Sequence, residues 1–180
     1  EDGFRTIGLE ISEYAADIGR KKGLDIKTEK IENADFKEGY FDIITMWDVI
    51  EHLPDPKNYL NKINLYLKKG GIVAINTPDC GSFCARLLGK RWHSLVPPEH
   101  INYFNKTSLV KILETSGFEI LEFSKMGKKF TIEYIAHTLS RWLGLSFFKF
   151  FSESIEKSKF GKISIPINLR DNVLVLAIKK

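Results

Sequence analysis

The sequence has few cysteines and no long apolar run. Two cysteines, Cys80 and Cys84, occur among 180 residues, which is too few for a disulfide framework, a structural zinc site or a three-cysteine iron–sulfur motif. Their spacing is typical of two side chains that pack on one helix face. No apolar stretch of about 18 residues and no secretory signal is present, so we expect a cytoplasmic protein without a membrane-spanning helix.

A basic stripe is also missing. The chain carries 27 Lys and Arg against 23 Asp and Glu, for a net charge of +4, and the two signs are interspersed. This distribution does not predict a nucleic-acid partner. With 43% hydrophobic and 28% charged residues, the chain is typical of one globular domain spanning residues 1–180.

What the sequence does contain is an alternation of strand and helix patterns. We predict strands at residues 5–11, 24–28, 41–47, 72–77, 118–124 and 172–180, and helices at 13–23, 57–69, 82–88 and 106–117. Ser12 is the expected N-cap of the first helix, and Gly70 with Gly71 is expected to end the second. Such alternation with short connections predicts an α/β fold with a doubly wound, mostly parallel, Rossmann-like sheet.

Polar residues follow the predicted strands where those strands end. Glu10 ends the first strand, and an acid at the carboxyl edge of an open α/β sheet can accept both hydroxyls of a ribose. The same acid also suits the N-terminus of the helix that follows, where the helix dipole favours negative charge.

The stretch 41-FDIITMWDVIEHLPDP-56 runs from an apolar strand into acids and a histidine. Asp48, Glu51 and His52 have the i, i+3, i+4 spacing that places them on one face of a helical turn. Three interpretations remain open: a divalent-cation site, a proton acceptor at His52, or a local cap that fixes the loop before the next helix.

Five segments in order resemble one family. They are 8-GLEIS-12, 36-FKEGYFDIITMWDVIEHLPDP-56, 67-LKKGGIVAINTP-78, 97-PPEHINYF-104 and 113-LETSGFEI-120. Together they resemble class I S-adenosylmethionine-dependent methyltransferases, in particular the group with an E-H-x-P-D-P segment that includes the ubiquinone-type O-methyltransferases. The resemblance implies S-adenosylmethionine as cofactor and a small molecule as methyl acceptor. We expect methylation of an oxygen atom of a sugar, a quinol or a lipid-linked compound.

The resemblance also implies a set of cofactor contacts. Glu10 would bind the ribose and Ile11 would pack on the adenine. Residues after the second strand would line the other side of the adenine, and residues at the end of the third would border the methionine portion. The implied cofactor-binding set is Glu10, Ile11, Glu29, Lys30, Ile31, Met46, Trp47 and Asp48. Some ubiquinone-type relatives are thought to use a divalent cation, for which Asp48, Glu51 and His52 are the candidate ligands.

The family's first strand and its Gly-rich turn, G-x-G-x-G, have no counterpart before Glu10. In the family's strand order that strand lies between the strands that end at Glu10 and Trp47. We therefore expect these residues to be the C-terminal part of a longer chain, and we expect the two flanking strands not to pair directly.

His100, in 97-PPEHINYF-104, is the second histidine of interest. The prolines and aromatic residues around it suggest a loop over the mouth of a pocket. His100 and His52 are the candidate catalytic residues, each of which could remove the acceptor's proton, and a hydrogen-bonded loop anchor is the alternative for both.

Residues 125–170 differ in composition from the predicted cofactor-binding core, 1–124 and 171–180. They are rich in Phe, Lys and Ser and are predicted to form a helical insertion or lid. The apolar, partly basic stretch 139–151 could contact a membrane surface or a lipid-linked substrate, or could pack as a lid or a homodimer face.

Two other functions remain open. A nicotinamide-dependent oxidoreductase would share the fold, but it would usually have a Tyr-x-x-x-Lys pair. Four positions after Tyr66 the sequence has Gly70, and four positions after Tyr59 it has Ile63, so neither tyrosine forms such a pair. A non-catalytic interaction domain that keeps the fold without binding the cofactor is the other alternative.

Overall fold

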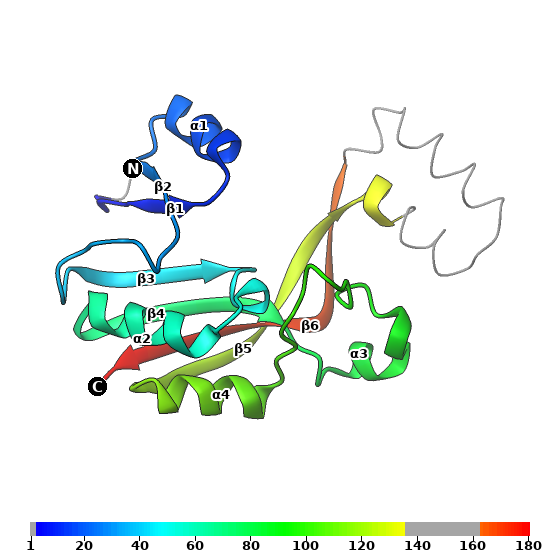
Figure 1. Cartoon of the computed structure of the whole chain (residues 1–180). Coiled ribbons are helices and arrows are strands. Elements are labelled where there is room, and N and C mark those ends of the chain that lie inside the picture. Colours follow the sequence, from blue (N-terminus) through cyan, green and yellow to red (C-terminus); the bar gives the residue numbers. More distant parts are fainter. Residues whose placement is uncertain (1–2, 136–162) are drawn as a thin grey trace.

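The computed structural model describes residues 3–135 and 163–180, which form an α/β fold with two sheets (Figure 1). The strands are β1 (Gly8–Glu10), β2 (Ile26–Thr28), β3 (Phe41–Trp47), β4 (Leu67–Pro78), β5 (Phe118–Thr131) and β6 (Ser164–Lys179). The α-helices are α1 (Glu13–Lys21), α2 (Pro56–Tyr66), α3 (Phe83–Leu88) and α4 (Lys106–Thr115), and two 3-10 helices are η1 (Ile50–His52) and η2 (Gly89–Arg91). The predicted α/β class is confirmed.

The strand directions combine parallel and antiparallel pairs. β1 pairs with β2 and β3 pairs with β4 in parallel, as expected where a helix connects consecutive strands. The larger sheet has the order β3–β4–β6–β5, and β6 lies antiparallel to both of its neighbours. The parallel pairs fit the predicted doubly wound arrangement, and the insertion of β6 makes the larger sheet mixed.

β1 and β3 do not pair with each other in the described part of the chain. β1 is hydrogen-bonded to β2, and β3 to β4. The prediction that these two strands are not direct neighbours is therefore confirmed. That a further strand lies between them stays a prediction.

The helices begin where side chains cap them. Ser12 Oγ accepts a hydrogen bond from the Ala15 N–H at 3.3 Å, which confirms the predicted N-cap. At the start of α4, Asn105 Oδ1 accepts from the Ser108 N–H at 2.9 Å while Ser108 Oγ accepts from the Asn105 N–H at 3.0 Å. This reciprocal capping box satisfies two backbone donors that a helix start otherwise leaves unpaired.

The predicted helix at 57–69 ends earlier than the glycines suggest. α2 stops at Tyr66, and Leu67 already has extended backbone angles and belongs to β4. Leu67 is fully buried in the core, and its packing in β4 replaces the predicted continuation of the helix through Leu67, Lys68 and Lys69. Gly70 supplies the left-handed backbone (φ 76°) that the chain adopts there.

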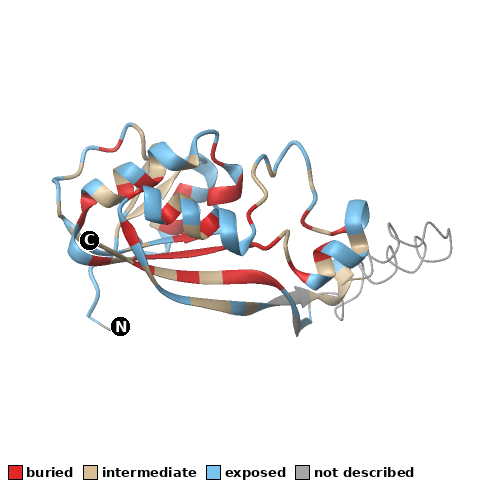
Figure 2. Ribbon diagram, turned by 90° about the horizontal axis from the view of Figure 1, so that it is seen from below, coloured by how far each residue is buried: buried red, intermediate tan, exposed pale blue. Residues whose placement is uncertain are grey.

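The core lies between one face of the larger sheet and the helices α2 and α4 (Figure 2). Its fully buried side chains come from both helices and from β4, β5 and β6, and they include Leu60, Ile63, Leu109, Leu113, Val73, Ile75, Val175 and Phe118. Fully burying one such aliphatic side chain contributes about 1.5–3 kcal/mol. This layer holds the carboxyl ends of β3 and β4 in place.

β5 and β6 extend beyond the sheet as a two-stranded ribbon. Their pairing continues to Thr131 opposite Ser164, so the ends of the segment predicted as a helical insertion, 125–131 and 164–170, are strands. The pairing between strands replaces the predicted helix there. The stretch 139–151 lies outside the described residues, and its proposed contacts stay predictions. In the two described ranges, no helix combines the length and the apolar character needed to cross a bilayer.

Candidate functional site

The predicted ligand-binding residues lie where parallel strands end. The register pairs Glu10 with Thr28 across β1 and β2, and Trp47 with Asn76 across β3 and β4. Each pair of parallel strands therefore ends at a common edge. In open α/β sheets, ligands bind beyond these carboxyl ends.

Glu10 is held by the helix that follows it. Its Oε1 accepts a hydrogen bond from the Ser12 N–H at 2.8 Å, which fixes the direction of the carboxylate and leaves a second oxygen. Ile11, the next residue, is 72% exposed. The two open roles of Glu10 are compatible, because one oxygen serves the helix start and the other can meet a ligand.

The segment after β2 carries Glu29, Lys30 and Ile31. Glu29 lies 3.8 Å from Lys27 Nζ, Lys30 is exposed, and Ile31 packs partly buried against the core. The predicted adenine contacts of Glu29, Lys30 and Ile31 stay predictions; the Ile31 side chain also packs against the core and so anchors the loop.

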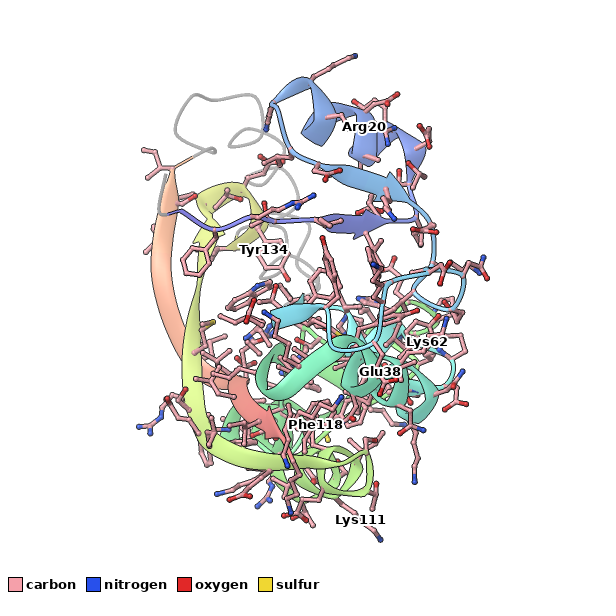
Figure 3. The ribbon with its side chains drawn as sticks, turned by 90° about the vertical axis from the view of Figure 1, so that its left-hand side faces the viewer. Arg20, Glu38, Lys62, Lys111, Phe118 and Tyr134 are labelled. Carbon is pink, nitrogen blue, oxygen red and sulfur yellow. The ribbon has the colours of Figure 1, made fainter. Side chains whose placement is uncertain are left out.

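Lys62 on α2 fixes this loop (Figure 3). Its Nζ donates to the carbonyl oxygens of Ile31, Glu32 and Ala34, at 3.3, 2.5 and 3.4 Å. Neighbouring tyrosines on the same helix add two contacts: the Tyr59 hydroxyl donates to Glu32 Oε1 and the Tyr66 hydroxyl donates to the Ala34 carbonyl. Burial, followed by the hydrogen bond to Glu32, raises the pKa of Tyr59 to about 12.

Met46 and Trp47, at the end of β3, point to opposite sides of the sheet. Met46 is 7% exposed and belongs to the core cluster, whereas Trp47 is 52% exposed. The predicted side-chain contact of Met46 with a ligand is therefore not supported, because alternation along the strand turns that side chain to the helix-covered face. Trp47 is left as the side chain that can border a ligand.

Asp48 turns the chain out of β3. Its backbone has a left-handed φ of 52°, which is uncommon for a residue other than glycine, and its N–H donates to the Asn76 carbonyl at 3.0 Å. Such backbone conformations are concentrated at functional sites. The turn directs the following residues, Glu51 and His52, toward the loop that contains His100.

His52 and His100 lie against each other, with ring centroids 4.7 Å apart and planes nearly perpendicular. His52 Nδ1 lies 2.7 Å from the Glu99 carbonyl oxygen, and His100 Nδ1 lies 2.8 Å from the Ser94 carbonyl oxygen. A carbonyl oxygen only accepts, so each Nδ1 carries the proton and donates it. In the neutral rings, both Nε2 atoms then hold a lone pair for a proton or a metal ion.

The backbone of Glu51 brings the two histidines together. The N–H groups of Ile101 and Asn102 both donate to the Glu51 carbonyl, at 3.1 and 3.0 Å. This docks the 97–104 loop onto η1, so the loop-anchor interpretation of His52 is compatible with the structure and does not exclude a chemical role.

The Glu51 side chain is only 2% exposed. Its Oε2 accepts from the Thr77 hydroxyl at 2.9 Å, while Oε1 has no hydrogen-bond partner among the described residues. An unpaired oxygen of a buried carboxylate is costly, which suggests a partner that the protein atoms do not supply.

A second buried polar cluster was not predicted and is centred on Asp171, within β6. Asp171 Oδ2 accepts from Trp92 Nε1 at 2.8 Å and lies 3.6 Å from His93 Nδ1. Burial, followed by the charge and hydrogen bond of Asp171, raises the pKa of Cys84, and burial, followed by the charge of Asp79, raises that of Cys80. Both thiols are thus held protonated and are poor nucleophiles.

Comparison with known proteins identifies the family. The family model described as "Methyltransferase domain" matches residues 1–122. This chain belongs to the class I S-adenosylmethionine-dependent methyltransferases.

Individual relatives are distant. This chain is 26% identical over 113 residues to an uncharacterized protein of Methanocaldococcus jannaschii, and the match covers 63% of this chain and 55% of that one. It is 21% identical over 162 residues to the ubiquinone biosynthesis O-methyltransferase of Aliivibrio fischeri, covering 77% of this chain and 69% of that one. The chain spans about half the length of the first of these relatives.

Solved structures share the fold. A SAM-dependent methyltransferase of Thermotoga maritima, described as a possible histamine N-methyltransferase, superposes with a TM-score of 0.63. The sequence identity is 24%, and the match covers 97% of this chain and 73% of that chain. The likeness confirms the Rossmann-like methyltransferase fold.

The residues at the ends of β1 and β3 fit S-adenosylmethionine. Glu10 offers an oriented carboxylate for the ribose hydroxyls, and the exposed Ile11 side chain offers an apolar surface for the adenine. The ring of Trp47 is half exposed, and its contact with the methionine portion stays a prediction. When bound, the cofactor supplies an electrophilic methyl carbon.

The histidine pair also fits a metal ion, but with a different ligand set from the predicted one. Ligand atoms of Glu51, His52 and His100 lie within 4.8 Å of one another, whereas Asp48 is outside the group. The helical spacing that linked Asp48 to the others is not realised, because η1 begins only at Ile50. Two imidazoles and one carboxylate suit zinc or another transition metal better than magnesium or calcium.

Proposed function

We propose that this methyltransferase transfers the methyl group of S-adenosylmethionine to an oxygen of a small-molecule acceptor. The observation that carries the proposal is the His52–His100 pair, whose Nε2 atoms hold lone pairs beside the carboxyl ends of β3 and β4. A relative that is itself an O-methyltransferase supports the choice of oxygen. Hydroxyl acceptors are weak nucleophiles until their proton is removed, and the two imidazoles provide bases for that proton.

His100 is the proposed base. Its Nδ1–H is committed to the Ser94 carbonyl, so Nε2 accepts the acceptor's proton as the new bond to the methyl carbon forms. His52 packs against the His100 ring and limits its rotation. Beyond this proton transfer, the protein's task is to align the acceptor oxygen with the methyl group.

The acceptors that the family resemblance implies are compatible with this chemistry. A sugar, a quinol or a lipid-linked compound each offers a hydroxyl group that one imidazole can deprotonate. Recognition of the remainder of the acceptor would fall to the 97–104 loop, which contains His100 and lies against His52.

A divalent cation is the second candidate for this site. The unpaired Oε1 of Glu51 and the two imidazoles favour it. Glu51, His52 and His100 would hold the ion, and the ion would lower the pKa of a bound hydroxyl. In that case both imidazoles are ligands and neither is the base.

Calorimetric titration of the full-length protein with S-adenosylmethionine tests the enzyme proposal first. We expect saturable binding that Glu10→Ala weakens and Glu38→Ala, at an exposed position after β2, leaves unchanged. Absence of binding would favour a non-catalytic interaction domain, and binding of a nicotinamide dinucleotide instead would favour an oxidoreductase.

Methyl-transfer assays over sugar and quinol panels then test the roles of the histidines. With a substrate found, we expect His100→Gln to lower kcat by about 10²–10⁴-fold with unchanged affinity for S-adenosylmethionine. Loss of activity on chelation, restored by zinc or manganese, would assign the histidines as ligands. Activity that survives chelation would assign His100 as the base.

A further inference from the structure

The segment after β4 exposes an unusual amount of apolar surface for a short helix. On α3, Phe83 is 80% exposed and Leu87 is 71% exposed. These residues are four positions apart, so they lie on the same helix face. Side chains of this size are normally buried when a helix packs on a sheet.

Cations accompany the two apolar side chains. Arg86 lies between them on α3, and Lys90 and Arg91 follow in η2, all three exposed. No Asp or Glu occurs from residue 80 to residue 98. Among the residues that the structure describes, none forms an ion pair with these cations. Phe83, Arg86, Leu87, Lys90 and Arg91 are called the basic–apolar patch below.

The patch is held on a fixed base. Ser82 Oγ accepts from the Ala85 N–H at 3.1 Å to cap α3, and the Ala85 side chain is buried. At the other end, the buried Trp92 donates its indole N–H to Asp171. The exposed side chains therefore belong to an ordered segment whose inner face is packed (Figure 2).

We propose that the basic–apolar patch docks on the surface of an anionic lipid bilayer. Phenylalanine and leucine side chains enter the boundary between headgroups and acyl chains, and arginine and lysine pair with anionic headgroups. The run of cations without acids gives the charge complementarity that such a surface requires. A symmetric dimer through this face would set cations against cations, which disfavours a second copy as the occupant.

The position of the patch connects it to the proposed reaction. α3 begins shortly after β4 ends, on the side of the molecule toward which β3 and β4 run (Figure 1). Docking would turn the carboxyl ends of these strands toward the lipid. If the proposed methyl transfer is correct, the acceptor would be membrane-bound or lipid-linked; this last step rests on the proposed function, whereas the docking does not.

Vesicle co-sedimentation of the full chain tests the docking. Vesicles of phosphatidylcholine alone are compared with vesicles that also contain phosphatidylglycerol, at low and high salt. We expect binding only to the anionic vesicles, weakened by salt. Each cation near an anionic surface strengthens binding about fivefold, so Arg86→Gln, Lys90→Gln and Arg91→Gln together should weaken it roughly a hundredfold.

A matched variant removes three exposed lysines elsewhere, Lys21→Gln, Lys22→Gln and Lys57→Gln, and should bind nearly as the wild type does. Phe83→Ser with Leu87→Ser should weaken binding at low and high salt alike, because it removes apolar insertion.

Equal binding of the patch and control variants, or no preference for anionic vesicles, would overturn the proposal. A wild-type dimer that dissociates in the Phe83→Ser, Leu87→Ser variant, without vesicle binding, would assign the patch to self-association and would overturn it as well. Vesicle binding without binding of S-adenosylmethionine would leave the docking standing and reject the methyl transfer.

Discussion

The β1–α1–β2 unit and the four-stranded sheet with its helices α2 and α4 (the four-stranded layer below) both combine strands and helices, but they bury very different amounts of apolar surface. α1 buries only Ala16 and Gly19, and Tyr14 on the same helix is 79% exposed. α2, of similar length, buries Leu60 and Ile63 completely. The residues that fit the adenosine portion thus lie on a weakly packed unit, while the histidine pair lies beside a densely packed layer.

This difference predicts that the β1–α1–β2 unit opens at a lower free energy than the four-stranded layer. A unit with few buried contacts opens locally, whereas the layer opens only with global unfolding. Ligand-binding elements are commonly drawn from the less stable end of this range. The following variants test the comparison, from the largest expected effect to the smallest.

Leu60→Ala should lower the free energy of unfolding by about 2–5 kcal/mol, because it leaves a cavity between α2 and the sheet. Ile18→Ala on α1 removes a side chain that is 39% exposed and should cost less than about 1 kcal/mol. Urea denaturation of both variants measures the difference. Equal losses would show that α1 is packed as firmly as α2 and would remove the distinction.

Lys62→Met tests the link between the two regions, since Lys62 joins α2 to the loop after β2. Hydrogen bonds from a charged group contribute about 1.5–3 kcal/mol, so we expect a loss near the lower end of that range. The amides of Asn33 and Ala34 should exchange hydrogen faster. Lys57→Met, at an exposed position on the same helix, is the control, and unchanged exchange in Lys62→Met would contradict the anchoring role.

Asn105→Ala and Ser12→Ala remove the same kind of cap in the two regions. Loss of an N-cap costs about 1 kcal/mol. We expect Asn105→Ala to lower the global free energy of unfolding by this amount. Ser12→Ala should instead speed amide exchange in α1 while the urea midpoint stays unchanged. A shift of the midpoint in both variants would mean that the chain unfolds as one cooperative unit.

Lys68→Gln should have the smallest effect. Lys68 Nζ lies 2.7 Å from Asp42 Oδ1, but the two side chains are 49% and 77% exposed. Exposed ion pairs contribute about 0–1 kcal/mol, and we expect less than about 0.5 kcal/mol here, diminishing with salt. A loss of several kcal/mol in urea denaturation would show that the β3–β4 edge depends on this pair.

The sequence predicted the elements better than the contacts between them. β3 has the predicted bounds, because an apolar run followed by polar residues marks both the strand and its end. The end of α2 was misplaced because burial of Leu67 decides that boundary, and burial is a tertiary property. The ribbon of β5 and β6 was missed at residues 125–131 and 164–170 because each of its strands is specified by the other.

The candidate site was predicted only in part, because its geometry also depends on tertiary contacts. His52 and His100 were each recognised, but their contact depends on the docking of the 97–104 loop on Glu51, which no spacing in the sequence encodes. The apolar strand ending in Met46 and Trp47 gave no indication of which face is covered by helices. Lys62 was missed because it binds backbone carbonyls, for which no partner residue type could be sought.

The place of β6 in the sheet has a consequence for folding kinetics. β6 is the last strand in the chain, yet it lies between β4 and β5 and pairs Ile178 with Ile72. During synthesis, β4 and β5 would both emerge with an unpaired edge before the strand that joins them is made. Pairing of β4 with β6 joins residues far apart in the sequence and is therefore slow. Strand edges that stay unpaired in the meantime favour aggregation. We therefore expect refolding to be limited by the docking of β6.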